Sequence, residues 1–147
     1  MAIAQTVLGY LQQYGVAYAV VAHPHTETSK SLASSAHVAP QELAKAVVLS
    51  DQQGYVMAVV PGDRHVDVRA LSRRLRRKLH LAQEATIAPI FGDCCRGAIP
   101  PLGTAYGIET VLDNSLLDAA QVYFEAGDHE ELIRVSGEDF QRLLRAT

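Results

Sequence analysis

The sequence predicts an α+β (mixed α/β) fold in which helices pack on one mixed β-sheet, within a single domain of residues 1–147. Two observations predict this fold. Valine-rich apolar runs alternate with segments whose apolar residues recur at helical spacing. Two of these runs are separated only by residues 51–54, which is a hairpin signal. Strands mixed with helices in this way indicate a sheet covered by helices.

The N-terminal third predicts a helix, a strand and a second helix. Residues 2–14 are expected to be helical because their apolar residues stand near helical spacing: Ile3, Val7, Leu8 and Leu11. The valine-rich residues 16–23, bounded by glycine and proline, predict a strand. A short helix is expected to begin at Thr28 or Ser29, either of which can cap it. Pro40 can then start a further turn.

Lys45 interrupts the first strand of the hairpin, "LAKAVVLSD". Side chains alternate between the faces of a strand, and here both faces are otherwise apolar, which predicts a strand covered on both sides. An unpaired buried ammonium costs several kcal/mol. Lys45 therefore needs a carboxylate partner, a route to water or a bound anionic ligand.

Residues 64–78 form a basic segment within an acidic protein. They hold seven basic residues and one acid, although the whole chain has a net charge of −3. A helix over residues 66–79 would bury Val68, Leu71, Leu75 and Leu79 and turn Arg73, Arg76 and Arg77 outward or sideways. The charge pattern favours an anion-binding surface that contacts nucleic acid or phosphate. The alternative is a solvated helix face balanced by neighbouring acids.

The last third mixes loop, strand and helix signals. The loop "FGDCCRGAIPPLG" holds three glycines and two prolines in thirteen residues, which indicates ordered irregular structure. The other predicted elements are a short helix at 82–90, a strand and turn at 108–115, two strands joined at Gly127 and a closing helix capped by Ser136 or Gly137.

Composition narrows the function classes. Hydrophobic residues make up 48% and charged residues 20% of the chain, as in soluble globular proteins. No apolar stretch approaches the roughly 18 residues that span a bilayer, so we expect a cytoplasmic protein with no membrane partner. The two cysteines, Cys94 and Cys95, are adjacent and lack a second pair for a zinc site, so we expect reduced thiols and no metal.

Three features together resemble the YbaK/ProX-type aminoacyl-tRNA deacylases, an editing family that also occurs inserted in bacterial prolyl-tRNA synthetases. They are the lysine entering an apolar strand, the Gly-x-x-x-Pro loop from Gly97 to Pro101, and the late segment "VYFEAGDHEELIRVSGEDFQRLL". Their order and spacing cover nearly the whole chain. Gly-x-x-x-Pro alone is a weak signal, whereas the three features at this length are fairly specific.

The resemblance implies a trans-acting hydrolase that cleaves the ester of a mischarged aminoacyl-tRNA carrying a small amino acid. It implies a mixed, partly barrel-like sheet with flanking helices, and neither a metal nor an organic cofactor. The implied partners are the acceptor end of aminoacyl-tRNA and, as a further candidate, an aminoacyl-tRNA synthetase. The basic helix residues Arg73, Arg76 and Arg77 would then bind the tRNA backbone.

The residues expected at the catalytic site are Lys45, Gly97, Ala98, Ile99, Pro101 and His129. Lys45 would supply a fixed positive charge to the tRNA end. Backbone amides of Gly97, Ala98 and Ile99 would stabilise the oxyanion of ester hydrolysis, while Pro101 fixes the loop. His129 would shape the pocket, position substrate or act as a base.

No Gly-x-Ser-x-Gly elbow or Ser/His/Asp set is present, so a covalent intermediate is not expected. The resemblance implies direct attack by water, assisted by the ribose hydroxyl of the substrate. Two alternatives stay open at this point. One is a non-catalytic RNA- or nucleotide-binding module on the same fold, and the other is a small esterase that does not act on tRNA.

Overall fold

A computed structural model describes residues 3–24, 37–95 and 97–145 of the chain. Its helices are α1 (Gln5–Gln13), α3 (Val68–Leu75), α4 (Glu84–Ile87) and α5 (Gly137–Arg145), and its strands are β1 (Ala19–Ala22), β2 (Ala44–Asp51), β3 (Gly54–Pro61), β4 (His80–Leu81), β5 (Glu109–Leu112), β6 (Gln121–Glu125) and β7 (Glu131–Ser136). The predicted α+β class is confirmed.

The strands form two sheets where the sequence predicted one. One sheet has the order β1-β7-β6 and the other β4-β2-β3-β5. A parallel bridge between Leu43 and Tyr123 joins them. The second sheet is mixed, because β3 pairs antiparallel with β2 and parallel with β5.

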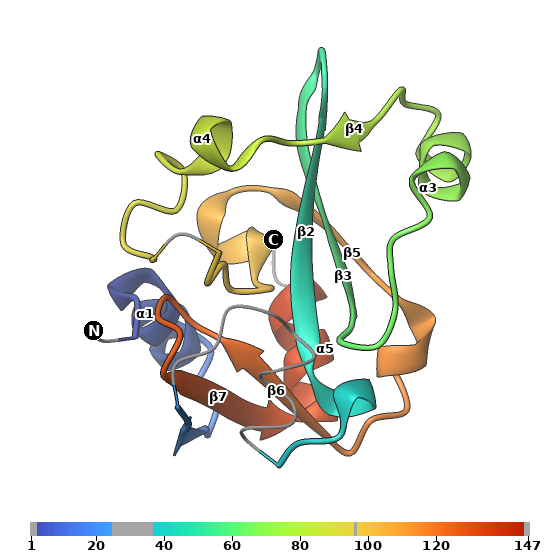
Figure 1. Cartoon of the computed structure of the whole chain (residues 1–147). Helices are drawn as coiled ribbons and strands as arrows, with labels where there is room; N and C mark the ends of the chain where they lie inside the picture. The colour runs from blue at the N-terminus through green and yellow to red at the C-terminus, as the bar shows by residue number, and fades with distance from the viewer. Residues whose placement is uncertain (1–2, 25–36, 96, 146–147) are drawn as a thin grey trace.

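The predicted hairpin is confirmed, with Lys45 opposite Val60 and Asp51 opposite Gly54. The carboxylate of Asp51 accepts hydrogen bonds from the amides of Gln53 (2.8 Å) and Gly54 (3.1 Å), and these bonds fix the turn. The hairpin projects beyond the rest of the molecule (Figure 1). Helices α3 and α4 lie on either side of it, connected through β4 (Figure 1).

Strand β2 is covered on both faces, as its apolar pattern predicted. Ala44 and Val48 pack in the main core, together with residues of α1, β6 and α5. On the opposite face, Leu49 packs in a second cluster with Leu71 of α3 and with Leu79. Lys45 alternates onto this second face, on which Leu49 also lies.

Several helices and strands are shorter in the structure than the sequence predicted. Helix α1 begins at Gln5, and β1 begins at Ala19 rather than at residue 16. Helix α4 is one turn at Glu84–Ile87 within the predicted 82–90. The helix expected from Thr28 or Ser29 lies outside the described residues.

Helix α3 ends four residues earlier than predicted. Asp67 caps its N-terminus by accepting a hydrogen bond from the amide of Ala70 at 3.0 Å. Arg76 then adopts the left-handed conformation, with φ +56°, which ends the helix. Leu79 is nevertheless buried as predicted, because the segment that follows the helix places it in the second cluster.

Helix α5 closes the fold against the three-stranded sheet. Ser136, one of the two predicted caps, accepts a hydrogen bond from the amide of Asp139 at 3.1 Å. Phe140 of α5 packs on Phe124 of β6, with ring centroids 5.7 Å apart. Across the described residues, every helix is too short or too polar to cross a bilayer.

Candidate active site

The Gly-x-x-x-Pro loop is held in place by the turn between β6 and β7. The amide of Cys95 donates to the carbonyl of Gly127 at 2.7 Å, and the amide of Gly127 donates to the carbonyl of Ala98 at 3.1 Å. Two segments about thirty residues apart in sequence are thereby fixed by backbone hydrogen bonds. Pro100 and Pro101 are buried behind them, which stiffens the loop further.

Gly97 and His129 meet at the centre of this arrangement. Gly97 has φ +83°, a conformation that favours glycine. A Cβ at this position would lie 3.5 Å from Cε1 and 3.7 Å from Nε2 of His129. The fold therefore brings together two of the residues that the sequence singled out separately.

A carboxylate on the adjoining strand orients His129. The imidazole is buried, with 7% of the residue exposed, and its Nδ1 lies 3.2 Å from Oε1 of Glu125 at the end of β6. The ring is thus positioned between a carboxylate and the backbone of Gly97. Nothing in the sequence marks Glu125 for this role, which depends on the turn after β6 that brings His129 back to the carboxylate.

Only part of the predicted set of amide donors can serve an oxyanion. The amide of Ala98 already donates to the carbonyl of Cys95 at 3.0 Å, and Ala98 is fully buried. The prediction that the Ala98 amide donates to the oxyanion is therefore wrong, and Ala98 instead shapes the loop. Gly97 and Ile99 stay as candidate donors, since no backbone hydrogen bond among the described residues uses either amide.

Gly97 and Ile99 line a pocket of about 200 Å³. Its other walls come from α4 and the segment after it: Glu84, Ala85, Ile87, Ala88, Phe91, Cys94 and Cys95. Most of these side chains are small or apolar, and Glu84 contributes a carboxylate. The sequence did not predict that α4 would form this wall.

A polar network supports the pocket from behind. The Tyr106 hydroxyl donates to Oδ1 of Asp93 at 3.0 Å, while the amide of Thr6 in α1 donates to Oδ2 at 2.9 Å. Asp93 therefore supplies the N-terminal cap that Ala4 cannot give to α1. Burial raises the pKa of the Cys94 thiol to about 12, so this group stays protonated near neutrality.

Lys45 is half-buried on β2 and does not line the pocket. Among the described residues its ammonium forms no hydrogen bond or ion pair. Of the three explanations for this lysine, the structural salt bridge therefore finds no support in the described part of the chain. A route to water and a bound anion stay open.

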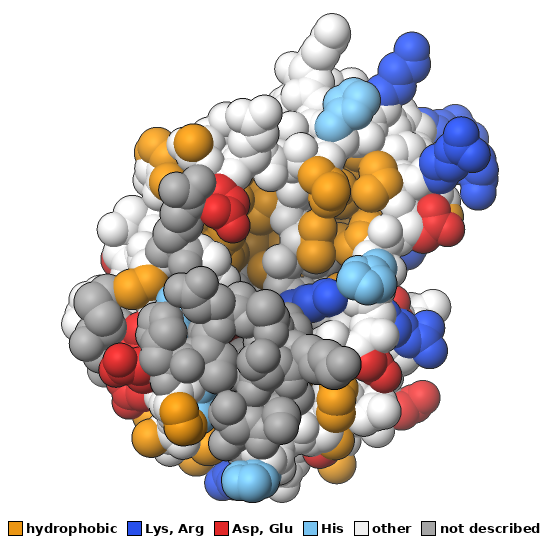
Figure 2. All heavy atoms as spheres, viewed as in Figure 1, with side chains coloured by type: hydrophobic (Ala, Val, Ile, Leu, Met, Phe, Trp, Pro, Cys, Tyr) orange, Lys and Arg blue, Asp and Glu red, His pale blue; other side chains and the backbone are white. Residues whose placement is uncertain are grey.

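The three predicted tRNA-binding arginines differ in their surroundings. Arg73 and Arg76 are exposed, whereas Arg77 turns inward and forms two hydrogen bonds of 2.7 Å with Asp51. Arg77 is thus already paired within the protein. Figure 2 shows Lys and Arg side chains gathered on the side of the molecule that carries α3.

The described residues offer no cluster of three or more His, Cys, Asp or Glu side chains that could hold a metal ion. The site consists instead of backbone amides, one buried imidazole and a small pocket. That arrangement can bind and polarise a carbonyl or ester oxygen.

Comparison with known proteins identifies the class. The family model described as the aminoacyl-tRNA editing domain matches residues 23–143. The chain therefore belongs to the aminoacyl-tRNA editing domain family, and the resemblance found in the sequence is confirmed. The matched span includes Lys45, the Gly97 loop and His129.

Solved structures show the same fold. A structure of "a putative trans-editing enzyme for prolyl tRNA synthetase" is similar with a TM-score of 0.84 and 24% identity, over 97% of this chain and 92% of that chain. The structure of hypothetical protein APE2540 is similar with a TM-score of 0.85 and 21% identity, over 97% and 96% of the two chains. None of the curated proteins searched matches the chain.

Proposed function

We propose that this protein is a trans-acting aminoacyl-tRNA deacylase that hydrolyses the ester between a small, mischarged amino acid and the 3′ end of tRNA. The observation that carries the proposal is the arrangement of residues around the Gly97 loop. A glycine with positive φ, a buried histidine and candidate amide donors meet beside a small pocket. Membership of the editing-domain family supports the same substrate class.

The volume of the pocket favours a small amino acid as the group that is removed. Pockets for drug-sized ligands measure about 300–1,000 Å³, whereas this pocket measures about 200 Å³. Its aliphatic and aromatic walls suit a short side chain such as that of alanine, serine, threonine or cysteine. Phe91, which is buried, is one of these walls.

In the proposed mechanism, water attacks the ester carbonyl directly. Amides of Gly97 and Ile99 stabilise the developing oxyanion, and the ribose hydroxyl of the substrate assists the attacking water. His129 fixes the loop and positions the substrate. Lys45 does not line the pocket, so its proposed partner is the phosphate or ribose of the terminal nucleotide rather than the amino acid.

The test is a deacylation assay with a panel of mischarged tRNAs. Because one structural neighbour is described as a trans-editing enzyme for prolyl-tRNA synthetase, the first substrates are tRNAs for proline that carry alanine, serine, threonine or cysteine. A synthetase partner is tested by adding prolyl-tRNA synthetase to the same assay. We expect hydrolysis of at least one small aminoacyl ester and none of the phenylalanyl ester.

The assay separates the alternatives. A non-catalytic RNA-binding module would hold tRNA without accelerating deacylation. A small esterase would cleave activated esters of short acids and leave every aminoacyl-tRNA intact. Either result would overturn the proposed function.

A further inference from the structure

In the segment after α3, residues 76–80, some side chains turn inward and others are exposed. Arg76, which is left-handed, ends the helix, and residues 77–79 lead from it to β4, where His80 pairs with Ser50 of β2. Arg77 and Leu79 turn inward, toward Asp51 and the second apolar cluster respectively. The alternate residues Arg76, Lys78 and His80 are exposed.

Asp51 fastens this segment to the hairpin turn. Its carboxylate accepts from the amides of Gln53 and Gly54 and also from Nε and Nη2 of Arg77, both at 2.7 Å. Hydrogen bonds from Arg77 hold the pKa of Asp51 well below its usual range. Asp51 is therefore charged near neutrality, and its charge is neutralised by a bidentate partner.

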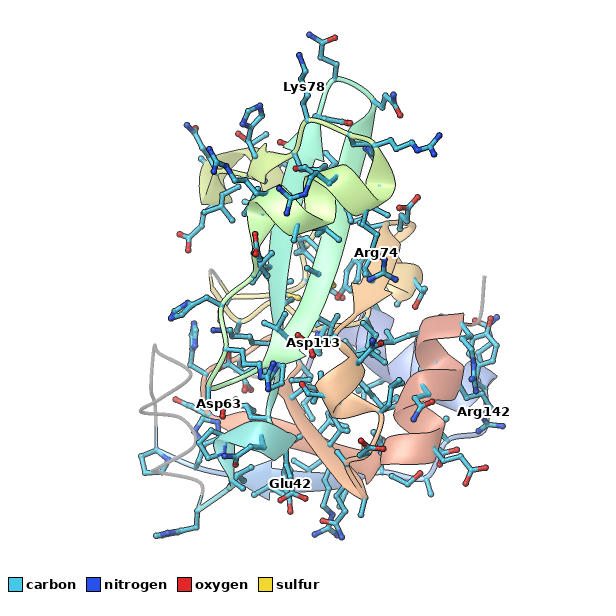
Figure 3. The ribbon with its side chains drawn as sticks, turned by 90° about the vertical axis from the view of Figure 1, so that its right-hand side faces the viewer. Glu42, Asp63, Arg74, Lys78, Asp113 and Arg142 are labelled. Carbon is cyan, nitrogen blue, oxygen red and sulfur yellow. The ribbon has the colours of Figure 1, made fainter. Side chains whose placement is uncertain are left out.

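The two segments enclose a concave polar surface between the hairpin turn and the chain after α3. It is lined by Ser50, Asp51, Gln52, Gln53, Arg76, Lys78 and His80. Since Arg77 balances Asp51, the remaining charges belong to Arg76 and Lys78. Neither of these side chains forms an ion pair within the described residues. In Figure 3 Lys78 lies at the tip of the hairpin, far from Arg142 of α5.

We infer that this surface is a phosphodiester-binding site for the RNA backbone, with Arg76, Lys78 and His80 as contacts and Asp51 and Arg77 as positioning residues. Arg76 and Lys78 give the charge that phosphate needs, and the side-chain amides of Gln52 and Gln53 add hydrogen-bond donors. The inference rests on the proposed function for the identity of the RNA, which is an acceptor stem.

Arg77 consequently acts through its neighbours and does not contact RNA. Its pair with Asp51 sets the direction of the exposed residues on either side of it. This assignment differs from a simple basic patch, in which each arginine contributes its own charge. The two descriptions predict opposite results when Asp51 loses its charge.

The test measures binding of an uncharged hairpin RNA that reproduces a tRNA acceptor stem, by fluorescence anisotropy at several salt concentrations. We expect Arg76→Gln/Lys78→Gln to weaken binding about tenfold and to lower the slope of log affinity against log salt by roughly 0.7–0.9 per lost contact. The control Arg134→Gln/Arg145→Gln removes two exposed charges on β7 and α5. It should leave the salt slope unchanged.

Asp51→Asn decides the positioning role. This change raises the net charge by one and releases Arg77, so a simple basic patch would bind RNA more tightly. We expect weaker binding, because the released Arg77 no longer holds the exposed residues on either side of it in place. Tighter binding by Asp51→Asn, or equal salt slopes for wild type and Arg76→Gln/Lys78→Gln, would overturn the inference.

These outcomes are independent of catalysis, because the probe carries no ester. If deacylation fails while the RNA measurements come out as expected, the proposed function is wrong and the phosphodiester site stands. Melting temperatures of all variants show whether each one is folded.

Discussion

The backbone of Gly97 lies against the imidazole of His129, close enough that a Cβ on residue 97 would contact Cε1 at 3.5 Å. The two residues come from a loop and a hairpin turn that share two backbone hydrogen bonds through Gly127. The positive φ of Gly97, +83°, is what favours glycine at this position. The contact between the two segments makes the candidate site sensitive to substitutions in either segment.

Replacing Gly97 by valine should slow turnover more than it weakens tRNA binding. A β-branched residue is strained at φ +83° and would press on His129, which displaces the loop amides. We expect kcat to fall about 100-fold, as when an oxyanion donor is lost, with the affinity for uncharged tRNA nearly unchanged. Single-turnover deacylation and a binding titration measure the two quantities.

Gly92→Val serves as the matched control in the same loop, because Gly92 has no positive φ while its added Cβ would meet a similar ordinary contact, the carbonyl oxygen of Pro89 at 3.6 Å. It should keep most of the activity. Equal losses of binding and rate in Gly97→Val would argue against a transition-state role for the loop.

Lys45→Ala should abolish deacylation without unfolding the protein. Lys45 forms no ion pair within the described residues, so its removal leaves no described carboxylate unpaired. We expect at least a 100-fold loss of kcat/KM and a melting temperature close to that of wild type. Lys45→Arg keeps the positive charge but moves the cationic group, so it tests whether deacylation also depends on the position of that group. A large drop in melting temperature with activity retained would support a structural role instead.

Gly127→Ala should destabilise the fold through the turn that holds the Gly97 loop. Gly127 has φ +112°, and a Cβ there would lie 2.9 Å from Cβ of Ala4. Strain and overpacking together should lower the free energy of unfolding by about 3 kcal/mol. Urea denaturation monitored by circular dichroism measures the change.

Gly107→Ala separates the two causes. Gly107 also has a positive φ, of +73°, but nothing lies within 4 Å of an added Cβ. It should cost about 1 kcal/mol, the backbone term alone. If both variants lose the same stability, the contact with Ala4 is not a constraint on the turn.

Asp51 should make stability depend on pH in the acid range. Its pKa is lower in the folded protein than in the unfolded chain, so the unfolded state binds more protons as pH falls. The stabilisation is fully present above the unfolded pKa of about 4 and is lost below it. Unfolding of wild type between pH 6 and pH 2 should therefore show a steeper fall than unfolding of Asp51→Asn.

Arg77→Gln should flatten the same curve, since Arg77 is the main cause of the lowered pKa. Curves for wild type and both variants that run parallel throughout this range would show that the Asp51–Arg77 pair does not stabilise the fold.

The sequence determined the α+β class, the hairpin and the family. Valine-rich runs, a four-residue turn and a lysine within an apolar strand are local signals, and alternation along a strand requires no knowledge of distant residues. Ser136 was likewise predictable as a cap, because capping depends on the residue next to the helix. The Gly-x-x-x-Pro loop and His129 were both recognised, but as separate features.

Tertiary structure alone decided how those features combine. Long-range backbone hydrogen bonds with Gly127 hold the Gly97 loop beside His129, which no sequence pattern indicates. Arg77 stands among similar basic residues in sequence, yet the hairpin turn presents Asp51 to it and changes its role. Such outcomes depend on which groups the fold brings within hydrogen-bonding distance, and local patterns along the chain report only on neighbouring residues.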